Sequence, residues 1–378
     1  YEIIKCDWSS DVCSSDLGER RVALAPETAK KFSALGAQLR MEQGAGLNSH
    51  FVDADYLNTE ITQAQAEAYQ NAQIIMRVTP PTLEEIEQMP HGAVLIGLLK
   101  PYESQERLAA LNARNISAFA LELLPRISRA QSMDALSSQG ACSGYQCALI
   151  GASHSAKFFP MLTTAAGTIR PARALVIGAG VAGLQAIATC KRLGAMVDAY
   201  DVRSAAKEQV ESLGAKFVDT GVSADGAGGY ARELTEEEKA QQADRLAKAV
   251  ASADVLITTA AIPGKKAPQI ITEAMIAGMK QGAVVVDMAA ESGGNCALTQ
   301  AGQTIQAHNA TIVGPVNLPS RMPTHASELY AKNLYNFLSP FIKDGELNID
   351  WQDEVIAGSL LCKDGATVHT GVKQVLGE

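Results

Sequence analysis

The chain has 378 residues, of which 47% are apolar, 19% charged and 5% aromatic, and it contains 31 glycines. This length favours two domains, and the composition is typical of a packed globular protein, which excludes a disordered or low-complexity chain. The formal net charge of −9 at pH 7 argues against nucleic-acid or anionic-membrane binding, since both need concentrated lysine and arginine.

The seven cysteines are scattered, with no CxxC pair and no Cys/His zinc spacing. This pattern predicts free, buried thiols in a reducing cytoplasm. The six histidines include no HExxH pair, so no metal site is predicted. The longest apolar stretch, 174–190, contains the glycines of a turn and Gln185, which a membrane-spanning helix would not carry. No signal peptide is predicted at the start of the chain.

The first 17 residues differ from the rest of the chain. They contain the related tetrapeptides SSDV and SSDL, two of the seven cysteines and one of the two tryptophans. We interpret residues 1–17 as a cloning or assembly scar and leave them out of the predicted fold. The alternative is a small disulfide or metal site on Cys6 and Cys13.

From Gly18 onward, short apolar runs alternate with segments of helical character. The runs are bounded by glycine, proline or polar residues and predict buried strands of a parallel sheet at 73–78, 93–99 and 117–124. The segment 26–35 predicts a helix with proline in its first turn and Gly36 after its end. Alternation of strand and helix predicts an α/β architecture.

A second series of strands begins near Ala172 and predicts a complete doubly wound domain. The predicted strands are 172–177, 196–200, 216–219, 254–259, 283–288 and 311–316, with a helix that ends at Leu193 after the first of them. From Ser327 the chain has a helical period that places on or near one face the apolar residues Leu329, Leu334, Phe337, Leu338 and Phe341. We expect this helix to cross back onto the first domain.

The predicted fold class is α/β, with two Rossmann-like doubly wound parallel-sheet domains and a nucleotide cleft between them. Residues 18–137 and 328–378 would form the first domain, and residues 138–327 would form the second.

The strongest motif is GAGVAG at residues 178–183, which follows a predicted strand and opens a predicted helix. Gly178 allows a tight turn, Gly180 lets the backbone approach a pyrophosphate, and Gly183 lets helix and strand pack closely. Asp201, at the end of the next strand, would accept hydrogen bonds from the adenosine ribose and repel a 2′-phosphate, which favours NAD(H). Arg203 complicates this prediction because it would serve such a phosphate. A packing turn without ligand is the alternative.

Two further segments are candidates. Residues 126–138 place arginine, glutamine, aspartate and serine after an apolar strand, with Gln131, Asp134 and Ser137 spaced by three. They suit a nicotinamide site, and a polar helix cap at a domain junction explains them at least as well. Residues 222–239 contain three glycines before Tyr230 and an acidic run after it. They suit a mobile lid, although spacing alone favours a solvated loop.

Six stretches together resemble one family, the NAD(H)-binding component of proton-translocating NAD(P) transhydrogenase. They are GERRVALAPETAKKFSALGA (18–37), PRISRAQSMDALSSQ (125–139), VIGAGVAGLQAIATCKRLGA (176–195), TTAAIPGKKAPQIITEAMI (258–276), DMAAESGGNCALTQ (287–300) and GPVNLPSRMPTHAS (314–327). The resemblance extends from Gly18 to the C-terminus. Residues 1–17 lack the family's opening strand and turn, which puts the first strand of the first domain in doubt.

The resemblance implies the site residues. Nicotinamide-end contacts would come from Arg126, Ile127, Ser128, Gln131, Asp134 and Ser137, with Gln131, Asp134 and Arg126 positioning the reacting ring. Pyrophosphate and ribose contacts would come from Gly178, Ala179, Gly180, Val181, Gly183, Asp201, Val202 and Arg203. Gly229 and Tyr230 would close over the nucleotide, and Gln242 and Ala261 would line it, with Ala261 in place of the more usual leucine.

The resemblance also implies a reaction. NADH on this component would pass hydride to NADP⁺ held on a separate component, and a membrane component would couple the exchange to proton movement. The chain would be a homodimer in the cytoplasm, held at the inner membrane by its partners. No convincing acid/base group appears in the sequence, which agrees with a reaction that moves hydride alone.

Two alternatives remain. Alanine dehydrogenase shares the two-domain plan but uses a lysine in the strand matched here by 73–78 and a histidine after the next strand. This chain has Arg77 and the stretch Leu98–Lys100 at those places. The other alternative is a non-catalytic NAD-binding module.

Overall fold

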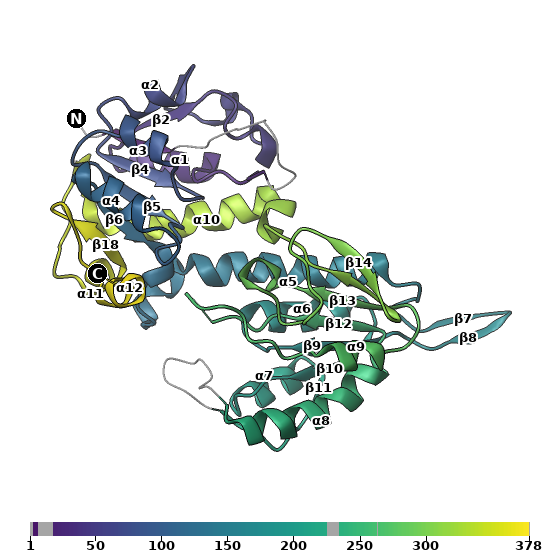
Figure 1. Ribbon diagram of the computed structural model, residues 1–378. Helices are drawn as coiled ribbons and strands as arrows, with labels where there is room; N and C mark the ends of the chain where they lie inside the picture. The colour runs from purple at the N-terminus through teal and green to yellow at the C-terminus, as the bar shows by residue number, and fades with distance from the viewer. Residues whose placement is uncertain (1–2, 7–17, 225–233, 263, 378) are drawn as a thin grey trace. The chain divides into compact units, whose positions relative to one another are not determined.

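The computed structural model describes residues 3–6, 18–224, 234–262 and 264–377 (Figure 1). These fall into two compact units: Tyr1–Gln139 with Pro319–Glu378, and Gly140–Leu318. The sequence predicts 138–139 and 319–327 in the second domain, whereas the structure assigns them to the first unit. Their hydrogen bonds explain the difference, because Gln139 contacts Arg21 and Ser320 contacts Arg20.

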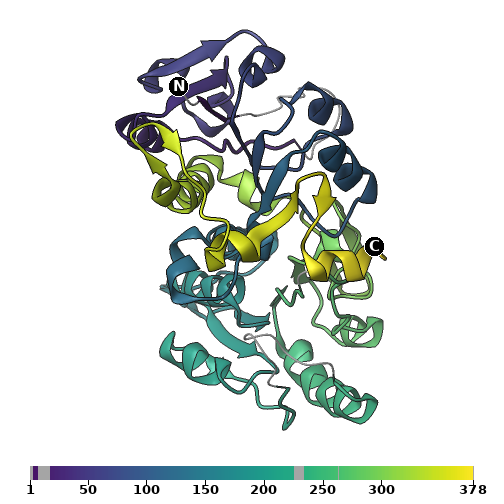
Figure 2. The same cartoon turned by 90° about the vertical axis from the view of Figure 1, so that its left-hand side faces the viewer.

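The first unit contains an eight-stranded sheet in the order β19-β18-β6-β5-β4-β1-β2-β3. Strands β1 to β6 are parallel, and β18 pairs antiparallel with β6. Figure 2 shows the yellow C-terminal strands completing this sheet. The strands are β1 Ile3–Cys6, β2 Gln38–Glu42, β3 Thr59–Thr62, β4 Ile74–Arg77, β5 Val94–Gly97, β6 Ser117–Ala120, β18 Leu360–Lys363 and β19 Ala366–Thr367.

Strand β1 corrects one prediction. Residues 1–17 were expected to lie outside the fold, and the first strand of this domain was in doubt, but Ile3–Cys6 pairs with β2 on one side and β4 on the other. The scar-like composition hid a short β-prone run, IIKC. Backbone pairing in the middle of a sheet needs little more than such a run.

Helix α10 (Pro323–Leu338) carries the C-terminal part of the chain onto the first unit. It starts at Pro323, four residues earlier than the expected start at Ser327, because proline suits the first turn of a helix. Leu334, Phe337 and Leu338 are buried in the same core as α1 (Pro26–Ala34), as expected. Leu329 is exposed, so its predicted place on the apolar face was wrong. The unit's other helices are α2 Gln65–Tyr69, α3 Leu83–Gln88, α4 Gln105–Ala113, α11 Glu354–Ser359 and α12 Thr370–Leu376.

The second unit contains a seven-stranded sheet in the order β11-β10-β9-β12-β13-β15-β14. All six strands predicted for this domain are present, and all of them are parallel. The structure adds β14 as an antiparallel edge strand and a separate hairpin, β7–β8. The strands are β7 Leu162–Thr164, β8 Gly167–Ile169, β9 Arg173–Ile177, β10 Met196–Tyr200, β11 Lys216–Phe217, β12 Val255–Thr258, β13 Ala283–Asp287, β14 Thr304–Ala307 and β15 Ala310–Val313.

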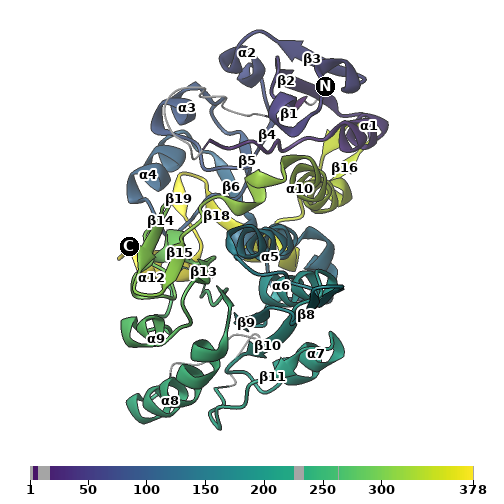
Figure 3. The same cartoon turned by 90° about the vertical axis from the view of Figure 1, so that its right-hand side faces the viewer.

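Helices cover both faces of this second sheet (Figure 3). One buried cluster joins the sheet to α5 (Ala135–His154) and α6 (Val181–Arg192), and α7 (Ala206–Ser212) lies on the same face. The other cluster joins the opposite face to α8 (Glu236–Ser252) and α9 (Glu273–Ala277). The predicted α/β class with Rossmann-like parallel sheets is therefore confirmed. The chain order reverses on the two sides of β9, and this is the place where doubly wound folds bind ligands.

Candidate functional site

The turn between β9 and α6 has the geometry predicted from its glycines. Gly178 has φ = +92°, a conformation that favours glycine, and a Cβ there would lie 2.8 Å from Thr259 Oγ1. A Cβ on Gly183 would overlap the carbonyl oxygen of Gly178. Both glycines are therefore required by the packing of the turn itself.

Gly180 differs from the other two glycines of the motif. A Cβ on Gly180 would meet no heavy atom of the described residues within 4 Å, and its φ of −76° is accessible to any residue. Internal packing does not explain a glycine here. The open space lies at the start of α6, where backbone N–H groups and the helix dipole favour an anion.

Asp201 follows β10 and lies beside this turn. Its side chain is buried and accepts four hydrogen bonds: from Ala179 N (2.7 Å) and from Arg203 N (2.8 Å), Nε (2.8 Å) and Nη2 (2.7 Å). Burial alone would raise the pKa of Asp201, but the bonds from Arg203 and Ala179 outweigh it and hold the pKa below its usual value. The carboxylate is therefore ionised at neutral pH.

Arg203 binds Asp201 through two of its side-chain nitrogens, so here it serves the carboxylate. The structure thus gives the arginine a partner inside the protein, where the sequence suggested a ligand phosphate. Because a carboxylate has about four acceptor positions, the four donors satisfy Asp201. A ribose hydroxyl would need at least one bond from Arg203 to be given up.

The remaining nucleotide-site predictions for this unit lie around the same end of the sheet. Gln242, on α8, donates from Nε2 to Tyr200 Oη (2.6 Å) at the end of β10. Ala261 follows β12 and is exposed. Val202 accepts a hydrogen bond from Ala224 N (2.9 Å) through its carbonyl group. Gly229 and Tyr230 lie outside the described residues, so the lid stays a prediction.

In the first unit, Asp134 and Ser137 bind each other at the start of α5. The Asp134 carboxylate accepts Ser137 N (2.9 Å) and Ser137 Oγ (2.5 Å), which is a helix-capping arrangement. The sequence leaves this alternative open beside the nicotinamide site. Of the other predicted residues here, three are exposed and Ile127 is half-buried; the exposed ones are Arg126, Ser128 and Gln131.

Side chains from the C-terminal part of the chain hold this segment in place. Nδ2 of Asn333 and of Asn336 both donate to the carbonyl oxygen of Ser132, at 3.0 and 2.9 Å, and Ser138 Oγ donates to Asn333 Oδ1 (2.6 Å). Arg129 forms a two-pronged ion pair with Asp353, with both N–O distances 2.6 Å. The bond from Arg129 lowers the pKa of Asp353. These contacts could not be predicted from the sequence because no local pattern links residues so far apart.

The two halves of the chain match the family models for the alanine dehydrogenase/PNT N-terminal domain (residues 14–143) and C-terminal domain (residues 147–370). The chain belongs to the alanine dehydrogenase/PNT family. It is 47% identical to an NAD(P) transhydrogenase subunit alpha protein of Rhodospirillum rubrum, over 93% of this chain and 95% of that protein.

Two further comparisons separate the branches of the alanine dehydrogenase/PNT family. The crystal structure of transhydrogenase from Sinorhizobium meliloti has a TM-score of 0.87 and 41% identity, covering 97% of this chain and 100% of that one. Alanine dehydrogenase of Mycolicibacterium smegmatis is 26% identical over 93% of this chain and 91% of its own length. Sequence similarity thus favours the transhydrogenase branch.

Arg77 occupies the place where an alanine dehydrogenase is expected to carry its lysine. It is 2% exposed. Its guanidinium binds Tyr69 Oη (2.8 Å), Thr79 O (3.1 Å) and both oxygens of Glu85 (3.0 and 3.1 Å). These partners hold β4, α2 and α3 together, so the charge serves the interior of the unit.

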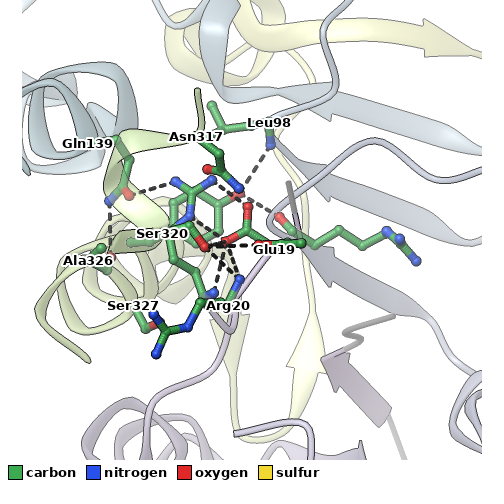
Figure 4. Close-up of polar contacts among 12 residues, drawn as sticks. Glu19, Arg20, Leu98, Gln139, Asn317, Ser320, Ala326 and Ser327 are labelled. Atoms are coloured by element: carbon green, nitrogen blue, oxygen red, sulfur yellow. Dashed lines mark hydrogen bonds and ion pairs between the residues drawn. The ribbon is translucent and has the colours of Figure 1, made fainter. Parts of the chain in front are cut away.

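A second buried arginine of the first unit ties the start of the family's N-terminal domain to two helices (Figure 4). Arg21 binds both oxygens of Glu19, at 2.7 and 2.8 Å, and Gln139 Oε1 at 2.7 Å. Gln139 in turn donates to the carbonyl of Ala326 on α10 (3.0 Å). Burial raises the pKa of Glu19, but the charge and hydrogen bonds of Arg21 outweigh it, so the net pKa is lowered.

The described cysteines (Cys142, Cys147, Cys190, Cys296 and Cys362) are buried and free, as predicted. Across the described ranges, no helix is both long and apolar enough to span a bilayer.

Proposed function

We propose that this chain is the NAD(H)-binding component of a proton-translocating NAD(P) transhydrogenase. The observation that carries the proposal is the turn at 178–183, where Gly180 leaves open space at a helix N-terminus and the neighbouring Ala179 N donates to the ionised Asp201. That combination fits a pyrophosphate next to a ribose. The similarity to transhydrogenase subunit alpha supports the choice of reaction.

The described residues fit NAD(H). The nucleotide would supply the dihydronicotinamide carbon from which hydride leaves. Gly180 would admit the pyrophosphate, and Asp201 would bind the adenosine ribose and disfavour a 2′-phosphate. At the other end, the exposed residues Arg126 and Gln131 would hold the nicotinamide, and Asp134 would position the segment by capping α5.

The protein's contribution to the reaction would be orientation. Hydride passing between two nicotinamides needs no proton at the reacting carbons, so the chain has only to hold the ring in reach of NADP⁺ on the partner component and to exclude other geometries. A membrane component would couple the exchange to proton translocation, and the chain would be held at the cytoplasmic side of the inner membrane through these partners.

Alanine oxidation is the weaker candidate. It requires a substrate-binding cation and a proton-transfer group, and the charge of Arg77 is already bound by Glu85 and shielded from solvent. Leu98, Leu99 and Lys100 stand where the histidine is expected.

We propose that the second unit mediates homodimerisation through the β7–β8 hairpin, which extends away from its sheet (Figure 1). A two-stranded hairpin is marginally stable alone, and this one exposes Ile169, while Phe158 and Met161 lead into it with 53% and 65% exposure. Such apolar exposure is typical of a surface covered by a partner. Light scattering tests this: Met161→Asp should give monomers, whereas Met196→Asp, at a similarly exposed methionine, should leave the dimer intact. A wild-type monomer would exclude the homodimer.

The function itself is tested with the full chain in two steps. Titration calorimetry should show NADH binding with little binding of NADPH. Adding a soluble NADP(H)-binding component of the same family should then give rapid hydride exchange between NADH and an NADP⁺ analogue. NADH production from alanine by the chain alone would support alanine dehydrogenase instead. NADH binding without exchange, with a partner shown to be competent, would leave the binding-module alternative.

A further inference from the structure

The block 287–299 carries some of the family resemblance, yet the proposed function gives it no role. After β13 the chain makes a short 3-10 turn and then passes through Gly293 (φ = +100°) and Gly294 (φ = +77°). A Cβ on Gly294 would lie 2.9 Å from the Asp287 carboxylate. These two glycines return the chain beneath the end of β12 and place Asn295 there, fully buried.

The side chain of Asn295 binds both backbone groups of Ala260. Its Oδ1 accepts Ala260 N (3.0 Å), and its Nδ2 donates to Ala260 O (2.8 Å) and to Pro268 O (2.9 Å). An amide that pairs with the N–H and the C=O of one residue does what a neighbouring strand would do. The loop after β12 thus gains the fixed backbone position that its lack of sheet pairing would otherwise deny it.

Asp287 supports the same arrangement from below. Its buried carboxylate accepts Thr258 Oγ1 (2.9 Å), Cys296 N (3.0 Å) and Thr299 Oγ1 (2.6 Å), as well as Ala289 N (3.1 Å). The end of β12 and the segment that carries Asn295 are therefore joined through one fully satisfied anion, and neither can shift without leaving a buried charge short of donors.

Ala260 in turn forms a wall of the glycine turn. A Cβ on Gly178 would lie 3.1 Å from Ala260 N, and the neighbouring Thr259 donates from Oγ1 to the carbonyl of Gly178 (3.0 Å). The residue on the other side of Ala260 is Ala261, which is exposed. A shift of Ala260 would therefore move both the wall of the turn and the residue proposed to line the nucleotide.

We infer that Asn295 is a positioning residue for the dinucleotide: it holds residues 259–261 against the turn at 178–183 so that the pyrophosphate site exists before the nucleotide arrives. This inference rests on the proposed function. Asn295 does not touch the ligand; it acts through Ala260. Preorganisation of this kind raises affinity because binding need not order the loop.

The experiment compares two asparagines of the same unit. Asn309 is the control, since its Nδ2 also donates to two backbone carbonyls, of Ala277 (3.4 Å) and Met279 (3.2 Å), but it precedes β15 at the sheet's opposite edge. NADH affinity is measured by calorimetry and stability by thermal unfolding for the full-length wild type, Asn295→Ala, Asn295→Ser and Asn309→Ala.

We expect Asn295→Ala to weaken NADH binding about tenfold, Asn295→Ser to weaken it less because a hydroxyl can still accept Ala260 N, and Asn309→Ala to change it less than about twofold. At saturating NADH, hydride exchange in Asn295→Ala should stay within about twofold of the wild-type rate, since the nicotinamide contacts lie on another segment.

Wild-type NADH affinity in folded Asn295→Ala or Asn295→Ser would overturn the inference, and so would an equal loss in Asn309→Ala, which would indicate a general effect of destabilisation. If Asn295→Ala fails to fold, Asn295→Ser decides the matter. Failure of the wild type to bind NADH would instead contradict the proposed function itself.

Discussion

The two segments proposed to hold the nucleotide are fixed in opposite ways. The turn at 178–183 is held by its own glycines and by the strands beside it, with Thr259 and Asp201 bonded directly to its backbone. The segment 126–138 is held by side chains from the end of the chain, chiefly Asn333 and Asp353. One site is thus built from neighbours within a motif, and the other depends on residues that no local pattern connects to it.

This difference predicts where substitutions act. Changes inside the turn should affect folding or nucleotide affinity, because the turn and the sheet share the same atoms. Changes around 126–138 should affect the geometry of the nicotinamide and hence the rate of hydride exchange, with smaller effects on affinity.

The largest effect is expected from the glycines of the turn. Gly183→Ala should reduce the free energy of unfolding by about 3 kcal/mol, because its Cβ would overlap the carbonyl of Gly178. Gly180→Ala should leave stability within about 0.5 kcal/mol of wild type, because its Cβ enters open space, and yet weaken NADH binding at least about tenfold by filling the space proposed for the pyrophosphate. Urea unfolding and calorimetry measure the two quantities. Unchanged NADH binding by Gly180→Ala would show that this space is not the nucleotide site.

The next effect concerns Gln131 in the first unit. Because Gln131 is exposed, Gln131→Asn should not change stability, but shortening the side chain should misplace the nicotinamide. We expect hydride exchange with a partner component to slow about a hundredfold, with the NADH dissociation constant nearly unchanged. Stopped-flow measurement of the exchange is the readout, and Ser132→Ala, on the same segment, is the control. A loss of affinity equal to the loss of rate would mean that Gln131 binds the nucleotide without orienting it.

Asp201 should have a smaller effect, confined to affinity. Asp201→Asn removes the charge, and NADH binding should weaken by about 1.5–3 kcal/mol, which narrows the preference over NADPH. Asp254→Asn is the matched control, since Asp254 is also buried and ionised but binds Lys157 and Lys280 at the other end of the strands. Equal calorimetric affinities of the wild type for NADH and NADPH would contradict the role of Asp201.

The same carboxylate makes a pH prediction for stability. The pKa of Asp201 is lower in the folded protein than its usual value, so its stabilising contribution is fully present above about pH 4. It should disappear as the pH falls through the folded pKa. The difference in unfolding free energy between wild type and Asp201→Asn should therefore be constant at neutral pH and shrink in acid.

The second unit could be predicted almost completely from the sequence, and the reason is physical. Its strands are short, apolar and buried on both faces, and its turn needs glycines at fixed places, so each feature leaves a local signal. The edge strand β14 was missed because its alternating exposure resembles a loop. In the first unit, β1 was missed because it lies in a segment of foreign composition, and β18 because it joins the sheet from the far end of the chain.

The candidate site follows the same rule. The turn and Asp201 could be predicted from spacing, but Arg203 could not be assigned, since its partner depends on side-chain conformation. The cap formed by Asp134 and Ser137 was left open because capping and ligand binding use the same residue types. Asn295 was recognisable only within a family pattern, and its contact with Ala260 required coordinates.

The smallest effect is expected at Asn333, and it tests the comparison most directly. Asn333 is buried, lies on α10 and binds both Ser132 O and Ser138 Oγ. Asn333→Ala should free the middle of the segment 126–138 and slow hydride exchange about tenfold, with NADH affinity within about twofold of wild type.

Asn336→Ala is the control for this prediction, because Asn336 donates to the same carbonyl from an exposed position and lacks the bond to Ser138. Its exchange rate should fall less than that of Asn333→Ala. If Asn333→Ala instead lowered NADH affinity and left the exchange rate unchanged, the segment would serve binding as the glycine turn does. The distinction between a locally built nucleotide site and a remotely held nicotinamide site would then be wrong.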